Sequence, residues 1–209
     1  MKNKKELRAE ETRKKILSAA GDLFSEKGYN AVSIREIAKE AGCSHTAIYL
    51  YFHDKETLLY ELSMPHLMQL RKRLELTLKK EDLTPEIKLK EIGMNFILFG
   101  LELGNMYDIF LKANASRVDE AAPVEEINEL RISLFRLLRE AIGEYLSIES
   151  SDQLLAYARI YFYTLHGIIT TYTPLGEPLE ELRNRLGQTF EEAIDILLLG
   201  FKEKRGTGK

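Results

Sequence analysis

The stretch from Ser33 to Leu59 reads SIREIAKEAGCSHTAIYLYFHDKETLL, and its spacing decides the fold of the first part of the chain. Apolar residues recur there at the i, i+3, i+4 and i+7 spacing of one helical face, at Ile34, Ile37, Ala38 and Ala41. Ser33 is placed to cap the start of this helix, and Gly42 is the residue best suited to end it in the left-handed conformation. Ser44 can cap a second helix two residues later. The spacing therefore predicts a helix-turn-helix.

The second helix of this motif begins after Ser44 and reads HTAIY. In a helix-turn-helix the second helix enters the major groove of DNA, and the residues near its N-terminus meet base edges. Ile48 is expected to face the core. The side chains expected to meet bases or phosphates from the two helices and their caps are Ser33, Arg35, Ser44, His45, Thr46, Ala47, Tyr49 and Tyr51.

Lys55 follows Asp54 and opens the next predicted helix. Its ammonium and the positive end of that helix could together hold one phosphate, which adds Lys55 to the predicted DNA-binding set. The same spacing also fits a small helical hairpin in which Ala38, Gly42 and Ile48 only pack against each other. Spacing alone leaves both interpretations open.

The residues from Arg13 to Leu59 resemble the N-terminal domain of the TetR family of transcriptional regulators. The family pattern is an amphipathic first helix ending in F-x-x-x-G-Y/F, followed by T/S-x-x-x-I-A-x-x-A-G-V-S-x-x-x-L/I-Y-x-Y/H-F-x-x-K-E-x-L. The matching residues here are Phe24, Gly28, Tyr29, Ser33, Ile37, Ala38, Ala41, Gly42, Ser44, Ile48, Tyr49, Tyr51, Phe52, Lys55, Glu56 and Leu58. Cys43, His45 and Thr46 depart from the usual residues, which leaves the operator sequence open. The resemblance implies DNA binding and regulation of transcription.

Composition places the chain among globular proteins that stay inside the cell. At 209 residues it can bury a core in each of two domains, and 30% of its residues are charged. No apolar run approaches the roughly 18 residues that a membrane span needs, and the N-terminus lacks the apolar core of a secretory signal. We expect a cytoplasmic protein without a membrane partner. The single cysteine, Cys43, permits no internal disulfide and is expected to be a small filler in the turn rather than a redox sensor.

The charge is distributed unevenly along the chain. The formal net charge is −3, but residues 1 to 55 hold eleven Lys/Arg against eight Asp/Glu, whereas the remaining residues hold nineteen against twenty-five. The basic part is thus the part with the helix-turn-helix. Seven cations near the N-terminus could lie along phosphates and add salt-dependent affinity, or could simply be solvated: Lys2, Lys4, Lys5, Arg8, Arg13, Lys14 and Lys15.

Beyond Leu59 the chain has helical patterning throughout. A helix from Lys55 to about Lys80 contains Pro65, and further helices are expected to start at Thr84-Pro85, near Gly104, at Ala122-Pro123, at Ser151-Asp152 and after Pro178. The predicted fold is all-α, with about nine helices. We expect a three-helix DNA-binding domain over residues 1–60 and a helical effector-binding and dimerisation domain over residues 61–209.

The penultimate predicted helix contains YARIYFYTLHGIITTY, which resembles a W-x-x-x-H-G element found in some TetR regulators. Phe162 stands in the tryptophan position, followed by His166 and Gly167. This helix is apolar nearly all round, as expected for burial against its own core and a second subunit. The last helix adds the apolar stripe Leu186, Phe190, Ile194, Leu197, Leu198 and Phe201. We expect both helices to form the interface of a homodimer, because a dimer places two reading helices one DNA turn apart.

The middle of the second domain carries residues suited to an apolar pocket. The candidate ligand-binding residues are Phe96, Phe99, Tyr107, Phe110, Phe135, Tyr163 and His166, with Met94 beside them. Each of these could equally be plain core, since aromatic residues at helical spacing usually are. The family resemblance implies a small-molecule effector of unknown identity that changes the separation of the two reading heads. We expect a repressor released from a double-stranded DNA operator by a small, largely apolar effector.

The main alternative class is an enzyme, and the sequence argues against it. The four histidines are scattered, and no HExxH, GxSxG, GxxxxGK[ST] or GxGxxG motif occurs. Acidic pairs such as Glu125-Glu126 begin predicted helices, where they favour the helix dipole. No cofactor and no metal site are expected. The remaining alternative is an architectural or division-linked DNA-binding protein of the same fold that acts through a protein partner and binds many genomic sites.

Overall fold

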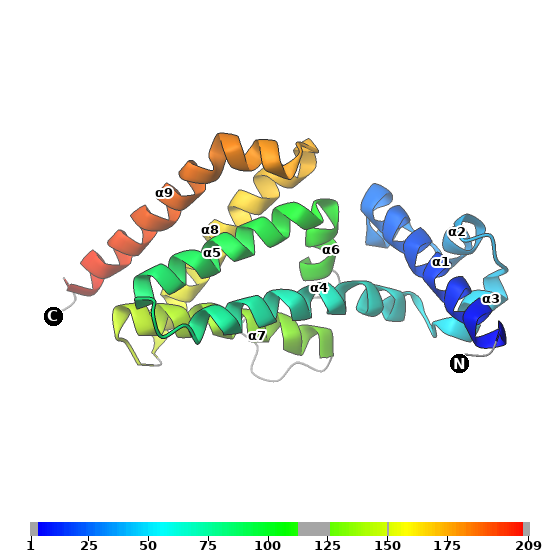
Figure 1. Ribbon diagram of the computed structural model, residues 1–209, viewed down its shortest axis with the longest axis horizontal. Helices are drawn as coiled ribbons and strands as arrows, with labels where there is room; N and C mark the ends of the chain where they lie inside the picture. Colours follow the sequence, from blue (N-terminus) through cyan, green and yellow to red (C-terminus); the bar gives the residue numbers. More distant parts are fainter. Residues whose placement is uncertain (1–3, 113–125, 150, 207–209) are drawn as a thin grey trace. The chain divides into compact units, whose positions relative to one another are not determined.

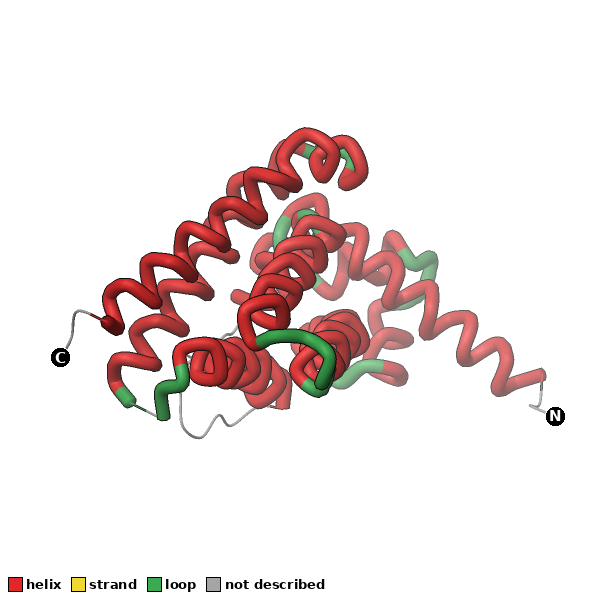
Figure 2. Tube along the Cα trace, turned by 60° about the vertical axis from the view of Figure 1, so that its left-hand side comes forward, coloured by secondary structure: helices red, strands yellow, loops and turns green. Residues whose placement is uncertain are grey.

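The computed structural model describes residues 4–112, 126–149 and 151–206. Over these ranges the chain forms nine α-helices and two short 3-10 helices, and Figure 1 and Figure 2 show no strand among them. The all-α prediction is confirmed. The expected helix start at Ala122-Pro123 lies outside the described residues. None of the described helices is both long and apolar enough to cross a lipid bilayer.

Residue contacts divide the described chain into two compact units. The first holds residues 4–67 and 105–112, and the second holds residues 68–104 with the described residues from 126 onwards. The first unit is therefore larger than residues 1–60, because it includes seven more residues of the fourth helix and a short helix from later in the chain. The assignment of DNA binding to residues 1–60 and of effector binding to residues 61–209 stays a prediction.

The first unit is built on helix α1, Lys4–Lys27, which packs against α2, Ile34–Glu40, and against α6, Asn105–Lys112. The short η1, Tyr29–Ala31, follows α1, and α3, His45–Tyr51, packs on α2. Side chains at helical spacing along α1 meet those of α2 and α3 in one apolar core, whose fully buried members include Ile16, Ala20, Phe24, Ile37, Ile48 and Phe52. This core fixes which face of α3 remains outside.

Helix α4 spans Lys55–Leu78 and contributes its first part to this unit. It begins where the sequence predicts, because Asp54 caps it: the Thr57 amide donates to Asp54 Oδ1 at 2.7 Å. The backbone hydrogen bond from Thr57 lowers the pKa of the Asp54 carboxyl. The helix ends two residues before the predicted Lys80, and Pro65 lies inside it.

The second unit contains α5, Pro85–Leu103, α7, Glu126–Leu146, α8, Asp152–Tyr172, η2, Thr173–Leu175, and α9, Leu179–Gly206. Helix α5 packs against α7, α8 and α9. The helix starts predicted at Thr84-Pro85 and Ser151-Asp152 are confirmed, and both are capped: Thr84 Oγ1 accepts from the Ile87 amide and Ser151 Oγ accepts from the Leu154 amide.

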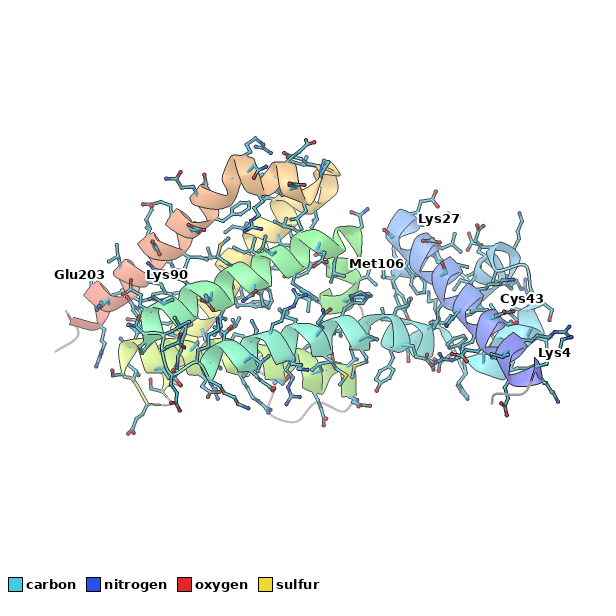
Figure 3. All side chains as sticks on the ribbon, viewed as in Figure 1. Lys4, Lys27, Cys43, Lys90, Met106 and Glu203 are labelled. Atoms are coloured by element: carbon cyan, nitrogen blue, oxygen red, sulfur yellow. The ribbon has the colours of Figure 1, made fainter. Side chains whose placement is uncertain are left out.

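An ion pair joins α5 to α9 within the second unit. Lys90, labelled in Figure 3, lies with its Nζ 2.8 Å from Asp195 Oδ1. The hydrogen bond to Asp195 raises the pKa of the Lys90 ammonium. Glu86, one turn earlier on α5, lies 3.3 Å from the same Nζ, so Lys90 is held from both sides.

Candidate DNA interface and effector site

The start of α2 is fixed by a capping box. Ser33 Oγ accepts a hydrogen bond from the Glu36 amide, and the Ser33 amide donates to Glu36 Oε2 at 2.9 Å. The backbone hydrogen bond from Ser33 lowers the pKa of the Glu36 carboxyl. The predicted cap at Ser33 is confirmed. Ser33 and Arg35 are both exposed at this end of α2, which is where the sequence places them as DNA contacts.

The turn between α2 and α3 has the predicted conformation. Gly42 has φ +66°, in the left-handed region that favours glycine, and the Cys43 amide donates to the Ala38 carbonyl oxygen at 3.0 Å. Ser44 then caps α3, because its Oγ accepts from the Ala47 amide at 3.0 Å. Cys43, labelled in Figure 3, is half-buried. Desolvation raises the pKa of its thiol, so the reactive thiolate is disfavoured.

Helix α3 turns one face to the core and one to solvent. Ile48 is fully buried, as predicted, whereas His45 and Thr46 are exposed. Tyr49 is 49% exposed, and its ring lies edge-on to the His45 ring with centroids 5.1 Å apart. Ala47 and Tyr51 are half-buried at the edges of the outer face. The residues predicted to meet bases therefore lie together on the outer side of α3.

Leu50 is a further residue on this helix that the sequence analysis did not include. Its side chain is 81% exposed. The sequence carries a signal for it, because Leu50 lies two residues after the buried Ile48 and so falls on the opposite side of the helix. A leucine has no donor or acceptor, so a search for polar groups that could meet bases does not select it.

Lys55 has a structural role that the sequence did not indicate. Its Nζ donates to the carbonyl oxygens of Tyr29 and Val32, both at 3.0 Å, and lies 4.4 Å from the centre of the Tyr29 ring. The ammonium thus ties the start of α4 to the segment that joins α1 and α2. Its predicted phosphate contact would have to be made in addition to these interactions.

The basic N-terminal residues divide into two groups. Arg13 forms an ion pair with Glu61 of α4, and its guanidinium lies 5.3 Å from the centre of the Phe52 ring, so it holds α1 to the rest of the unit. Five others are exposed along α1, namely Lys4, Lys5, Arg8, Lys14 and Lys15. Lys2 lies outside the described residues. The exposed cations remain predicted phosphate neighbours.

In the second unit, the aromatic side chains gather around Phe162 of α8. Its ring lies 6.1 Å from Phe96 of α5 and 6.0 Å from Phe135 of α7, both edge-on, and 5.8 Å from the stacked ring of His166. Three predicted ligand-binding residues from three different helices, Phe96, Phe135 and His166, therefore surround Phe162. Phe162 itself was named from the sequence only as the substitute for a tryptophan.

Two other predicted ligand residues of this unit differ from each other in burial. Phe99 is 5% exposed on α5, whereas Tyr163 is 59% exposed on α8. Tyr163 follows Phe162 directly, so its side chain leaves the helix in another direction. The expectation that Tyr163 forms an inner wall is wrong for this unit, because its side chain lies on the outer face of α8.

Tyr107 and Phe110 belong to α6 and therefore to the first unit. They are 0% and 2% exposed, and the Phe110 ring lies 5.6 Å from that of His66. Asn105 at the start of α6 donates to the Ser25 carbonyl oxygen of α1 at 3.2 Å. Both aromatic residues thus form core between α6 and its neighbours in the helix-turn-helix unit.

A buried polar pair on α7 was also missed. Arg131 is 6% and Asn128 4% exposed, and Arg131 Nη1 donates to Asn128 Oδ1 at 2.8 Å. Arg131 lies one helical turn before Phe135 and shares its face. The sequence signal was an arginine at a position where the helical period expects an apolar residue.

The apolar stripe of α9 faces inwards. Phe190, Ile194, Leu198 and Phe201 are 1–4% exposed. Our expectation that the stripe forms the subunit interface is wrong for these four residues, because their face of α9 packs on α5 of its own chain. The other two members, Leu186 and Leu197, are half-buried. The exposed apolar residues of α9 are Ile196 and Leu199, at 62% and 65%. A shallow groove beside them is lined by Arg185, Gln188, Thr189, Glu192, Ala193 and Ile196.

Comparisons with known proteins agree with this architecture. Residues 16–62 match the family model described as "Bacterial regulatory proteins, tetR family". The fatty acid metabolism regulator protein of Bacillus subtilis is 28% identical over 190 residues, which is 90% of this chain and 95% of that protein.

Solved structures show the same fold. The FadR transcriptional regulator of Bacillus subtilis in complex with stearoyl-CoA superposes with a TM-score of 0.63 at 23% identity, over 88% of this chain and 96% of that one. The TetR family regulator PfmR of Thermus thermophilus gives 0.64 at 23% identity, over 88% and 93%. These relatives are described as regulators of transcription or metabolism rather than as enzymes.

Proposed function

The chain belongs to the TetR family of DNA-binding transcriptional regulators, and we propose that it is a homodimeric repressor released from its operator by a fatty acid derivative. The observation that carries the DNA-binding part is the outer face of α3. There His45, Thr46 and Tyr49 are exposed while Ile48 holds the helix to the core. This is the arrangement of a recognition helix whose exposed residues meet base edges.

The proposal requires two copies of the chain, because one recognition helix offers only a few base contacts. The exposed faces of α8 and α9 suit this role. Tyr163 on α8 and Ile196 and Leu199 on α9 are each about 60% exposed in the single chain, so their apolar surface is available to a partner. Arg185 on the groove of α9 is already ion-paired with Glu177 of its own chain, whereas Glu192 is exposed on the same groove.

The effector part is supported by the aromatic cluster around Phe162 and by the similarity to the fatty acid metabolism regulator of Bacillus subtilis. Aromatic walls suit an acyl chain, since burying each methylene contributes about 0.8 kcal/mol. Arg131 carries a permanent charge beside Phe135 on α7.

One experiment tests the whole proposal. Selection from random duplexes with the purified chain should yield a pseudo-palindromic sequence with half-sites about one DNA turn apart. Adding oleate or stearoyl-CoA should then weaken operator binding, whereas coenzyme A alone should not. If the free chain bound no duplex and gained affinity only with an acyl ligand, release from the operator would be the wrong mechanism and the ligand would be a corepressor or activator signal.

A genome-wide binding map separates this proposal from the architectural alternative. A metabolic repressor should occupy one or a few promoters, and the adjoining genes should encode enzymes of acyl-chain chemistry. Dozens of sites without promoter preference, unaffected by oleate or stearoyl-CoA, would support the architectural role instead.

A further inference from the structure

Leu50 is the most exposed large apolar side chain among the residues that the structure describes. It is 81% exposed, compared with 65% for Leu199 and 49% for its neighbour Tyr49. Leucine is among the residues most often buried in proteins. Its position on the short helix α3, rather than in a loop, means that the helix holds this side chain outwards.

The geometry of α3 gives Leu50 defined neighbours. Ile48 and Phe52 are 0% and 1% exposed and together fix the inner face of the helix. Thr46 lies one turn before Leu50 and is exposed on the same side. The outer face therefore carries two adjacent rows: an aromatic row formed by His45 and Tyr49, and a second row formed by Thr46 and Leu50, in which Leu50 is the purely apolar member.

Leu50 can read one feature of DNA. A leucine side chain has no donor or acceptor, so it gains nothing from phosphates or from the polar edges of bases. The C5 methyl group of thymine is the apolar feature that base pairs present in the major groove. We propose that Leu50 contacts a thymine methyl group and specifies that base in each half of the operator. This inference rests on the proposed DNA-binding function and identifies a specificity residue within it.

The methyl group can be removed without changing any hydrogen bond of the base pair, because deoxyuridine pairs as thymidine does. Starting from the selected operator, each thymine is replaced by deoxyuridine, at the equivalent position of both half-sites together. The dissociation constant is measured for each duplex at fixed salt. One position should show a loss of about fourfold per methyl group, and thus about fifteenfold for the pair.

Variants then assign the loss to Leu50. In Leu50→Ala the penalty at this position should fall to less than about twofold, while penalties at other thymines persist. Leu50→Met keeps an apolar tip and should keep the penalty. Leu76→Ala is the matched control, because Leu76 is 55% exposed on α4 and lies far along the chain from α3. Because Leu50 is exposed, its variants should fold as the parent chain does, which circular dichroism checks.

Two results would overturn the inference. Either no thymine would show a methyl penalty with the parent chain, or every penalty would survive in Leu50→Ala. In both cases the parent chain would still bind its operator specifically, so the proposed function would stand. Failure of that function looks different, because the parent chain would then select no duplex at all.

Discussion

The Tyr161 hydroxyl donates a hydrogen bond to the Leu89 carbonyl oxygen at 2.8 Å, inside the second unit. Tyr161 is fully buried, and desolvation raises the pKa of its phenol, so it stays a neutral donor. The bond joins α8 to α5 and is possible because residue 93 is a glycine. A Cβ at that position would lie 2.2 Å from the Tyr161 hydroxyl oxygen and 2.9 Å from Ile194 Cδ1. Three helices therefore meet at Gly93.

Gly93→Ala should lower the free energy of unfolding by about 1–3 kcal/mol, because overpacking a filled core forces its neighbours to move. Urea unfolding measures the change. Gly187→Ala in α9 is the control, since its Cβ would meet only the flexible Arg183 side chain at 3.7 Å. That change should be neutral or stabilising, as alanine is the better helix former.

A double variant tests whether Tyr161 is the obstacle. Tyr161→Phe removes the oxygen that the new Cβ would meet, at a cost of about 1 kcal/mol for the lost hydrogen bond. Gly93→Ala with Tyr161→Phe should then be less destabilised than the sum of the two single changes. Strict additivity would show that the clash is relieved elsewhere.

Lys55→Met should destabilise the first unit by about 1–2 kcal/mol, because two charge-assisted hydrogen bonds to Tyr29 and Val32 are lost. Thermal unfolding measures this, with Lys39→Met on the exposed face of α2 as the control. Operator titrations at several salt concentrations, at a temperature where both variants are folded, address the predicted phosphate contact. A log–log salt slope smaller by about 0.9 per subunit, and so by about 1.8 for the dimer, in Lys55→Met would support that contact, and an unchanged slope would leave Lys55 a structural role only.

The corrected orientation of α9 predicts opposite outcomes for neighbouring residues. Leu199→Asp and Ile196→Asp should dissociate the proposed dimer while the chain stays folded, because both side chains are exposed in the single chain. Ile194→Asp should unfold it, because a carboxylate would be buried against α5. Light scattering and circular dichroism together separate the two results. A dimer that survives both exposed substitutions would place the interface on another face.

The cap at Asp54 predicts how the first unit responds to acid. The pKa of Asp54 is lower in the folded chain than its ordinary value of 3.8, mainly because the Thr57 amide donates to it. Its contribution to stability is therefore complete above that ordinary value and is lost as the pH falls through the lower, folded-state pKa. Asp54→Asn keeps a capping group but cannot titrate. Its Tm should fall less steeply than that of the parent chain below about pH 4, with Asp22→Asn as the control for net charge.

The local features of this chain could be predicted from sequence, because each depends on a few neighbouring residues. Ser33, Gly42 and Ser44 act within one helical turn, and their caps and turn form as expected. The period of α9 likewise indicated one apolar face. Periodicity shows that a face is buried but not what covers it, so Phe190 and Ile194 were assigned to a second subunit although they pack in their own core.

Features that depend on partners distant in the chain were not predictable in this way. Lys55 finds its carbonyl acceptors 26 and 23 residues earlier, at Tyr29 and Val32. The centre of the aromatic cluster at Phe162 required three helices to be placed together. Hydrophobicity alone would bury Leu50, which α3 instead exposes.

The aromatic cluster predicts which substitution uncouples the effector from DNA. Phe162→Ala removes the ring that contacts Phe96, Phe135 and His166, so an acyl chain would lose its central wall. A hundredfold release from the operator requires about 2.7 kcal/mol of difference in ligand affinity between the two states of the proposed repressor. Losing one aromatic wall costs an amount of this order.

Release by oleate or stearoyl-CoA should therefore fall by about tenfold or more in Phe162→Ala, while the operator affinity of the free chain stays within about twofold. Operator titrations with and without the ligand measure both quantities on one preparation. Tyr163→Ala is the matched control, because Tyr163 is the next residue of α8 but is 59% exposed. It should leave release unchanged at protein concentrations where light scattering shows that the variant is still a dimer. If both variants lost release equally, the loss would reflect a disturbance of α8 as a whole rather than of the aromatic cluster. If release were unchanged in Phe162→Ala, the effector would bind elsewhere in the second unit.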